Sequence, residues 1–213
     1  GYSTGCLVHA TFGMVLSMVG QMQYFDSAVK SGNYSKGPSF TDVSKVFWEL
    51  KGKKYGVVGL GNIGSKVAHI AKAFGMEIVY YSTSGNPHSD EFQAVSLEQL
   101  MSECDVISVH CPLNERTNNL ITYDKLKLMK PTAYIFNLGR GGIINEADLV
   151  QALNDNLLAG AGVDVFAKEP LPLDSPYLKV NDPSKILLTP HIGWASQEAR
   201  ICLVEKIAEN IRN

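Results

Sequence analysis

A glycine-rich loop between an apolar run and a helical segment is the feature that most restricts how this chain folds. Residues 59–64 read Gly-Leu-Gly-Asn-Ile-Gly. The apolar run 54–60 has the composition of a strand that is buried in a parallel sheet. Residues 62–74 follow with the pattern of a helix. A strand, a tight glycine turn and a helix in this order are typical of a unit that binds a dinucleotide.

The three glycines and the two residues just before the third glycine have separate expected roles. Gly59 permits the tight turn, Gly61 lets the backbone approach a pyrophosphate, and Gly64 lets the helix pack close to the strand. Asn62 and Ile63 begin the helix, whose free N–H groups and partial positive charge favour phosphate. A purely structural turn is the alternative, and the strand–loop–helix context favours dinucleotide binding over it.

The rest of the chain predicts an open parallel sheet. Short apolar runs alternate with helical patterns, which is the sequence pattern of an α/β protein with crossover helices. Five further strands are expected at 77–82, 105–111, 133–138, 160–165 and 185–189, with helices at 97–103, 123–129, 146–154 and 196–213. The predicted fold is therefore a Rossmann-type, doubly wound parallel sheet, and we assign residues 1–213 to a single dinucleotide-binding domain.

The N-terminal segment 4–31 predicts one long helix. Apart from His9 it carries no ionisable charge before Asp26, and its apolar residues surround much of the helix circumference. Such a helix is expected to be packed on the sheet or on a partner subunit. Ser17 and Gln21 are among the polar residues that make it a poor membrane span, and no basic start marks a signal peptide. The chain begins without Met and ends within a helical pattern, so we expect further sequence on both sides.

Composition excludes several classes of partner. The net charge is −2, and the 19 basic residues form no run, so no nucleic-acid footprint is present. The four cysteines have neither a CxxC pair nor the Cys/His spacing of a zinc site, so no metal is expected. Free thiols are typical of a reducing compartment. We expect a cytoplasmic protein without nucleic-acid or membrane partners.

The end of the second expected strand bears on the choice of dinucleotide. An Asp or Glu is usual there, because its carboxylate binds the ribose 2′-hydroxyl of NAD. This chain instead has Ser82 and Thr83, followed by Ser84. A carboxylate would repel the 2′-phosphate of NADP, whereas hydroxyls would not, yet no Arg or Lys follows within several residues to bind that phosphate. The sequence leaves NAD and NADP open, with NAD expected.

Three polar clusters follow later strands. They occupy residues 137–142, 162–170 and 189–194. In an open α/β sheet, ligands bind outside the carboxyl ends of the strands. All three clusters are therefore expected at the edge that carries the glycine loop. An arginine, a glutamate and a histidine in these clusters are each common as surface or loop residues, and their joint occurrence favours a functional site.

The sequence resembles the D-isomer-specific 2-hydroxyacid dehydrogenases over nearly its whole length. The matching stretches are GYST, LKGKKYGVVGLGNIG, AKAFGM, VHCPLNERTNNLI, MKPTAYIFNLGRGGIINEADLVQAL, AGAGVDVFAKEPL and LLTPHIGWAS, in the family's order. The YYSTSG and HIGWAS variants look most similar to the glycerate dehydrogenase/hydroxypyruvate reductase-like members. The resemblance implies hydride transfer between NAD(P)H and the C2 position of a small D-2-hydroxy or 2-keto acid, without identifying that acid.

The resemblance implies residue roles that the chemistry also supports. Arg140 would hold the carboxylate and keto oxygen of the substrate. His191 would donate a proton to the carbonyl oxygen, and Glu169 would orient its ring and favour its protonated form. Asp164 would lie beside the nicotinamide carboxamide. The expected cofactor-binding residues are Gly59, Gly61, Asn62, Ile63, Gly64, Ser82, Thr83, His110, Cys111, Pro112, Thr117, Asn137, Leu138, Gly139, Asp164, His191 and Gly193.

Other histidines and the tryptophan near the third cluster have weaker interpretations. His9, His69 and His88 match no catalytic motif and are expected to be structural or surface residues. Trp194 is open between a packing residue and a wall of the substrate pocket.

The family resemblance also implies what this chain lacks and what it binds. Family members carry a substrate domain built from residues before GYST and after the last helix, so the chain alone is expected to bind the dinucleotide with little turnover. The family dimerises through this domain, and we expect a homodimer with helix 4–31 at its interface. The alternative function is a dinucleotide-sensing corepressor of the C-terminal-binding-protein type, although no partner-binding tail is visible. Phosphoglycerate and formate dehydrogenases are the alternatives among enzymes.

Overall fold

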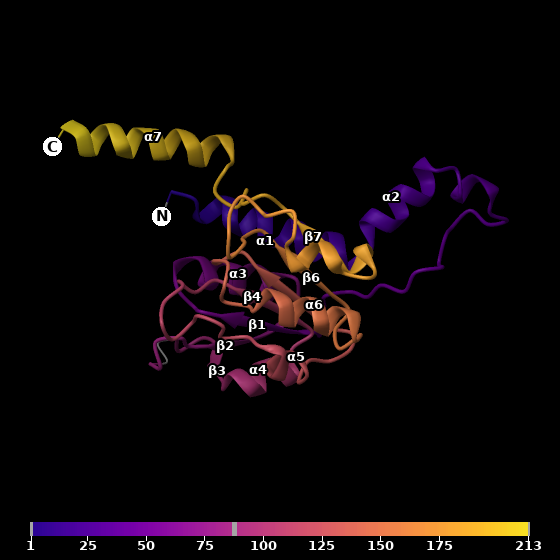
Figure 1. Ribbon diagram of the computed structural model, residues 1–213, viewed down its shortest axis with the longest axis horizontal. Helices are drawn as coiled ribbons and strands as arrows, with labels where there is room; N and C mark the ends of the chain where they lie inside the picture. The colour runs from indigo at the N-terminus through magenta and orange to yellow at the C-terminus, as the bar shows by residue number, and fades with distance from the viewer. Residues whose placement is uncertain (1, 87–88, 213) are drawn as a thin grey trace.

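A single parallel sheet forms the centre of the molecule. The computed structural model describes residues 2–86 and 89–212 (Figure 1), so His88 lies outside the described residues. The described residues form seven strands in the order β3-β2-β1-β4-β5-β6-β7, all paired in parallel. The strands are β1 Lys54–Val58, β2 Glu77–Tyr81, β3 Gln93–Ala94, β4 Val106–Val109, β5 Tyr134–Asn137, β6 Gly160–Val163 and β7 Ile186–Leu188. The predicted Rossmann-type fold is confirmed.

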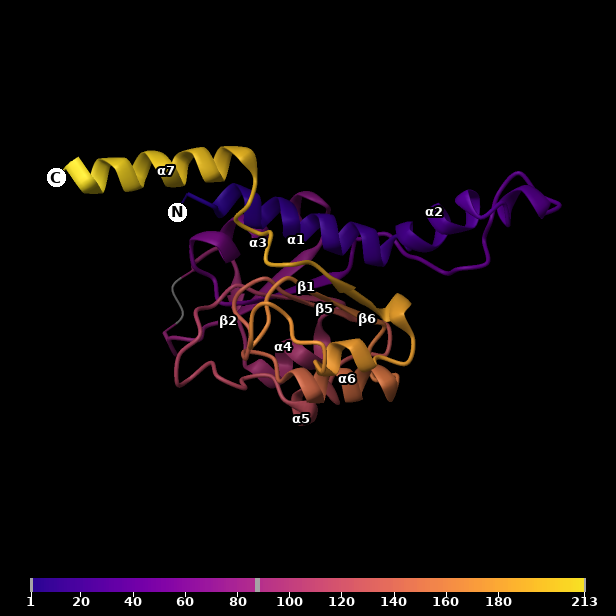
Figure 2. The same cartoon turned by 45° about the horizontal axis from the view of Figure 1, so that its top comes forward.

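Helices cover both faces of the sheet, and the sheet separates two apolar cores. Val15 and Val67 belong to the core under α1 and α3, and Leu100 and Leu149 to the core on the opposite face. Figure 2 shows α1 and α3 above the sheet and α4, α5 and α6 below it. These helices are α1 Thr4–Val19, α3 Asn62–Ala73, α4 Leu97–Glu103, α5 Tyr123–Leu126 and α6 Glu146–Asn154. β1, β4, β5 and β6 are buried almost throughout, as their apolar sequences predict.

The strand order positions the site. β1 lies between β2 and β4, and the chain reverses its direction of progress across the sheet at this point. A crevice opens at the carboxyl ends of the strands where the order reverses. The loops after β1, β2 and β4 therefore border one crevice. β3 was not predicted, because its two residues are too short to give a periodic signal.

The prediction of one helix over 4–31 is wrong, because the segment forms two helices. α1 ends at Val19, and α2 (Met22–Lys30) starts after a break at which Gln21 adopts the left-handed conformation, with φ 53°. The Gln21 side-chain amide donates to the Met18 carbonyl oxygen at 3.0 Å and to the Tyr134 hydroxyl at 3.1 Å. These bonds satisfy the C-terminus of α1 and turn the chain away from the sheet.

The two halves of the N-terminal segment have different surroundings. α1 packs on the sheet and on α3, as expected, and buries eight residues. α2 buries only Ala28, and with the following segment it extends away from the sheet (Figure 1). Taken singly, none of the described helices has the length and apolar character of a membrane span; α1 and α2 meet that criterion only as a pair bent by 64°.

The remaining elements are short helical turns and the C-terminal helix. The 3-10 helices are η1 Tyr34–Lys36, η2 Pro176–Lys179 and η3 Pro183–Lys185. The helix expected at the C-terminus is α7 Gln197–Arg212, which projects from the sheet and buries only Ala199 (Figures 1 and 2).

Candidate functional site

The glycine loop connects β1 to α3 and is shaped by close backbone contacts. Gly59 has φ +92°, and a Cβ there would lie 2.8 Å from the Cβ of Cys111. A Cβ at Gly64 would lie 2.2 Å from the carbonyl oxygen of Gly59. Only glycine fits these two positions. At Gly61 the Cβ direction is open, because an added Cβ would have no heavy atom of the described residues within 4 Å apart from its chain neighbours.

The N-terminus of α3 opens toward this loop without a side-chain cap. Gly61 is the capping residue and is extended, so it offers no side-chain oxygen to the first N–H groups of the helix. Uncapped N–H groups and the positive end of the helix dipole favour an anion. Together with the open space at Gly61, this arrangement fits the pyrophosphate of a dinucleotide. Asn62 donates to the Thr4 hydroxyl at 3.0 Å, which ties this helix turn to α1.

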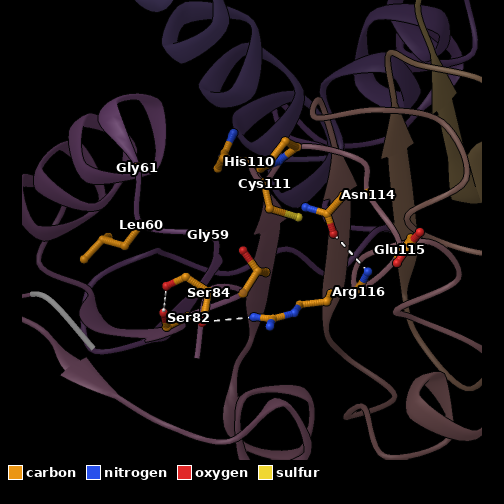
Figure 3. Close-up of a pocket in the computed structure, with 12 residues that line it drawn as sticks. Gly59, Leu60, Gly61, Ser82, Ser84, His110, Cys111, Asn114, Glu115 and Arg116 are labelled. Atoms are coloured by element: carbon orange, nitrogen blue, oxygen red, sulfur yellow. Dashed lines mark hydrogen bonds between the residues drawn. The ribbon is translucent and has the colours of Figure 1, made fainter. Parts of the chain in front are cut away.

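A cleft of 610 Å³ lies beside the glycine loop, at the carboxyl ends of β1, β2 and β4 (Figure 3). Seven of the expected cofactor-binding residues line it, namely Gly59, Gly61, Ser82, Thr83, His110, Cys111 and Pro112. Five residues that sequence reasoning missed line it too, namely Leu60, Ser84, Asn114, Glu115 and Arg116. The turn 114–116 belongs to the cleft because β2 and β4 both flank β1, which follows from the strand order rather than from any local pattern.

His110 forms part of the wall of the cleft and is half-buried. Its Nε2 lies 2.8 Å from the Ser108 hydroxyl. Its buried Nδ1 has no hydrogen-bond partner among the described residues. Desolvation lowers the pKa of His110 to about 4, so the ring is neutral near pH 7.

Three expected residues are buried, and their side chains hold loops in place. The Thr117 hydroxyl donates to the Pro112 carbonyl oxygen at 2.6 Å and accepts from the Asn114 N–H at 2.8 Å. The Asn137 side chain bonds to backbone atoms of Gly139 and Arg140. These buried side chains therefore fix the conformation of the loops at the carboxyl edge of the sheet. Asn137 and Thr117 are 1 % and 0 % exposed, which leaves their side chains no free surface in the cleft.

Asp164 is the third of these buried residues and fixes the loop after β7. Its Oδ1 accepts hydrogen bonds from the Thr189 hydroxyl at 2.5 Å and from the Ile192 N–H at 2.8 Å. Its Oδ2 accepts from the Gly193 N–H at 2.8 Å. The Asp164 carbonyl oxygen also accepts from the His191 N–H at 2.9 Å. The carboxylate of Asp164, which is expected beside the nicotinamide, thus binds the backbone around His191.

Arg140 lies in the loop after β5, and this loop packs against the loop after β6. A Cβ at Gly141 would lie 1.9 Å from the carbonyl carbon of Phe166, so only glycine allows this approach. Arg140 is exposed, and its guanidinium donates to the Gly139 carbonyl oxygen at 2.8 Å. The backbone N–H of Phe166 donates to Oε1 of Glu169 at 2.9 Å. The structure therefore brings the loops of Arg140 and Glu169 into contact.

Glu169 and His191 form a hydrogen-bonded pair at the same edge. Oε2 of Glu169 lies 2.7 Å from Nδ1 of His191, which leaves Nε2 of the ring available. Partial burial raises the pKa of Glu169, but the Phe166 N–H, His191 and the charge of Arg140 together outweigh it and hold the pKa below its ordinary value. Glu169 is therefore ionised at neutral pH and oriented toward the imidazole.

Asp164→Asn tests the anchoring of the His191 loop. Both carboxylate oxygens of Asp164 accept hydrogen bonds, so the NH2 group of the new asparagine would face an N–H or O–H donor. We therefore expect the free energy of unfolding to fall by about 2–3 kcal/mol. Asp182→Asn is the matched control: Asp182 also accepts two bonds from Ser184, but it caps a turn in solvent and Asn is an equally good cap. Urea unfolding followed by circular dichroism measures both. Equal losses in the two variants would contradict this role of Asp164.

His110 gives the protein a pH-dependent stability. Between its unfolded pKa of about 6.5 and its folded pKa of about 4, only the unfolded state binds the proton, so stability is lost as the pH falls. From pH 7 to about pH 5 we expect the wild type to lose about 2 kcal/mol more than His110→Gln, which retains polar atoms but does not titrate. Urea unfolding at both pH values measures the difference. Equal losses of stability in the wild type and in His110→Gln would show that His110 is protonated in the folded state near pH 5.

Comparison with known proteins identifies the family. Residues 12–193 match the NAD binding domain of the D-isomer specific 2-hydroxyacid dehydrogenases. A glyoxylate reductase from Thermococcus litoralis is 36% identical over 99% of this chain and 64% of its own length. A glycerate dehydrogenase from Methylorubrum extorquens is 31% identical over 99% of this chain and 65% of its own length.

The structural comparison agrees with the sequence comparison. A D-lactate dehydrogenase from Aquifex aeolicus, crystallised with NAD and lactic acid, is 28% identical and superposes with a TM-score of 0.88 over 100% of this chain and 66% of that one. The chain thus spans about two thirds of the length of these proteins. The expected family is confirmed, and these matches give no support to the corepressor alternative. The chain belongs to the D-isomer specific 2-hydroxyacid dehydrogenase family and carries its NAD-binding domain.

Proposed function

We propose that this chain is the dinucleotide-binding part of an enzyme that reduces a small 2-keto acid of the glyoxylate and hydroxypyruvate class to the D-2-hydroxy acid. The observation that carries the proposal is the 2.7 Å contact between the Glu169 carboxylate and the His191 imidazole, in a loop cluster that also carries Arg140. The names of the relatives from Thermococcus litoralis and Methylorubrum extorquens support the substrate class.

The dinucleotide would be held by the cleft and by the first turn of α3. The open space at Gly61 and the uncapped N–H groups of that turn suit the pyrophosphate. The cleft residues from Ser82 to Pro112 suit the adenosine half, and the ends of β5, β6 and β7 suit the nicotinamide half. The buried residues Thr117, Asn137 and Asp164 would act by positioning the backbone that meets the cofactor.

The residues of this chain would supply the proton and the substrate contacts. When bound, the nicotinamide supplies the hydride for the C2 carbon of the keto acid. His191 would transfer the proton on Nε2 to the carbonyl oxygen, because Glu169 occupies Nδ1 and stabilises the protonated ring. Arg140 would bind the substrate carboxylate with its planar guanidinium. In the opposite direction His191 would accept the proton of the hydroxyl group.

We also propose that the protein is a homodimer in the cytoplasm. The segment around α2 exposes large apolar side chains, with Phe40 91 %, Val43 82 % and Val46 89 % exposed. Clustered apolar exposure of this kind is typical of an interface with a partner. The cysteines are free thiols, which fits a reducing compartment.

His191→Gln tests the catalytic proposal. Because the chain spans 64% of the Thermococcus litoralis enzyme, the assay uses a chimera in which that enzyme supplies the remaining part. We expect glyoxylate- or hydroxypyruvate-dependent loss of reduced nicotinamide absorbance. Removal of the proton donor should lower kcat by about 100- to 10 000-fold.

His69→Gln is the matched control for this experiment. His69 also pairs with a carboxylate, that of Glu91 at 3.0 Å, but it lies on the exposed face of α3. We expect this variant to keep the kcat of the parent chimera. A His191→Gln variant with normal turnover would overturn the proposed role of His191, and a chimera that binds the dinucleotide but reduces neither acid would overturn the substrate class.

A further inference from the structure

We propose that the cleft selects a dinucleotide with a phosphate on the 2′-oxygen of the adenosine ribose, and that Arg116 is the residue that determines this selectivity. The inference rests on the proposed place of the adenosine half in this cleft. It concerns a residue that contributes nothing to the glycine loop or to the Arg140, Glu169 and His191 cluster.

The end of β2 offers hydroxyl groups where a carboxylate would select against phosphate. Residues 82–86 read Ser-Thr-Ser-Gly-Asn, and Ser82, Thr83 and Ser84 all line the cleft. A carboxylate at this position would accept from the ribose 2′-hydroxyl and would repel a 2′-phosphate. Here the Thr83 hydroxyl makes no hydrogen bond to the described residues, so it is free to donate to a ligand.

Arg116 reaches this strand end from the other side of the cleft. Its Nη1 donates to the Ser84 carbonyl oxygen at 3.3 Å, across 32 residues of sequence. Figure 3 shows the Arg116 side chain extended from the turn after β4 toward Ser82 and Ser84. A cation is therefore present beside the expected 2′-position, although none follows β2 in the sequence.

The turn that carries Arg116 is firmly anchored. The side-chain oxygen of Asn114 accepts the Arg116 backbone N–H at 2.9 Å, and the buried Thr117 hydroxyl bonds to Pro112 and Asn114. Pre-organisation of this kind lowers the entropic cost of binding through the side chain that follows.

The charges in the cleft favour an anion at this place. Among the described residues that line the cleft, Arg116 is the only permanent cation and Glu115 the only carboxylate. Figure 3 shows Glu115 on the far side of the turn from Ser82 and Ser84. Arg116 makes a single long side-chain bond among the described residues, so most of its five N–H donors remain available. A guanidinium binds phosphate oxygens in a planar, two-pronged arrangement.

Titration of the 213-residue chain with NADPH and NADH tests the inference without turnover. Quenching of protein fluorescence or isothermal calorimetry gives each Kd. We expect the chain to bind NADPH more tightly than NADH. Arg116→Gln should weaken NADPH binding by about 10- to 100-fold, because hydrogen bonds to a charged group are lost. The same change should alter NADH binding by less than about threefold.

Two further variants make the result specific. Ser82→Asp places a carboxylate at the end of β2, and we expect it to weaken NADPH binding and strengthen NADH binding, which reverses the preference. Arg200→Gln removes the same charge from the exposed helix α7 and should change neither Kd. Ser82→Asp also keeps the test decisive if Arg116→Gln does not fold.

The possible outcomes separate this inference from the proposed function. Equal weakening of NADPH and NADH by Arg116→Gln would overturn the inference, because Arg116 would then only stack on the adenine ring that both ligands share. A wild-type preference for NADH would overturn it as well, while the dinucleotide-binding role would stand. Failure of the wild type to bind either dinucleotide would overturn the proposed function itself.

Discussion

The parallel alignment of the strands is the constraint on which the whole site depends. Because every strand of a parallel sheet delivers its following loop to the same edge, the loops after β1, β5, β6 and β7 meet there with the glycine turn, Arg140, Glu169 and His191. The backbone hydrogen bonds of the buried strands β4, β5 and β6 therefore set the spacing of groups that are far apart in the sequence.

Close backbone contacts at the carboxyl edge of the sheet add to the positioning that the strands provide. Gly64 lets helix α3 approach the carbonyl oxygen of Gly59, and Gly141 lets the loop after β5 approach the backbone of Phe166, more closely than any side chain permits. Asp164 then binds the next loop along the sheet with three hydrogen bonds to its carboxylate. The backbone on both sides of the His191 ring is thus fixed by Asp164, and the ring itself contacts Glu169 at 2.7 Å.

Local patterns in the sequence predicted the sheet well, and they named seven of the residues that line the cleft, because they reflect local physics. The glycine loop has its own steric signature, and the buried strands are apolar runs. The break at Gln21 was missed because it depends on a bond to Tyr134, which is distant in the sequence. Arg116 was missed for the same reason, since it approaches Ser84 only after the strands are ordered in space. The burial of Asp164 also depends on three loops together and has no local signal.

The contact of Gln21 with Tyr134 connects the projecting segment to the interior of the sheet. Tyr134 opens β5, the strand that leads to Arg140, so the direction in which α2 departs is set by the same strand that positions the arginine. The arm formed by α2 and the residues after it thus leaves the body of the protein at a defined angle. The Tyr134 ring also lies 6.1 Å from the ring of Trp48, so the segment that leaves the sheet after Gln21 returns to the same residue at the start of β5.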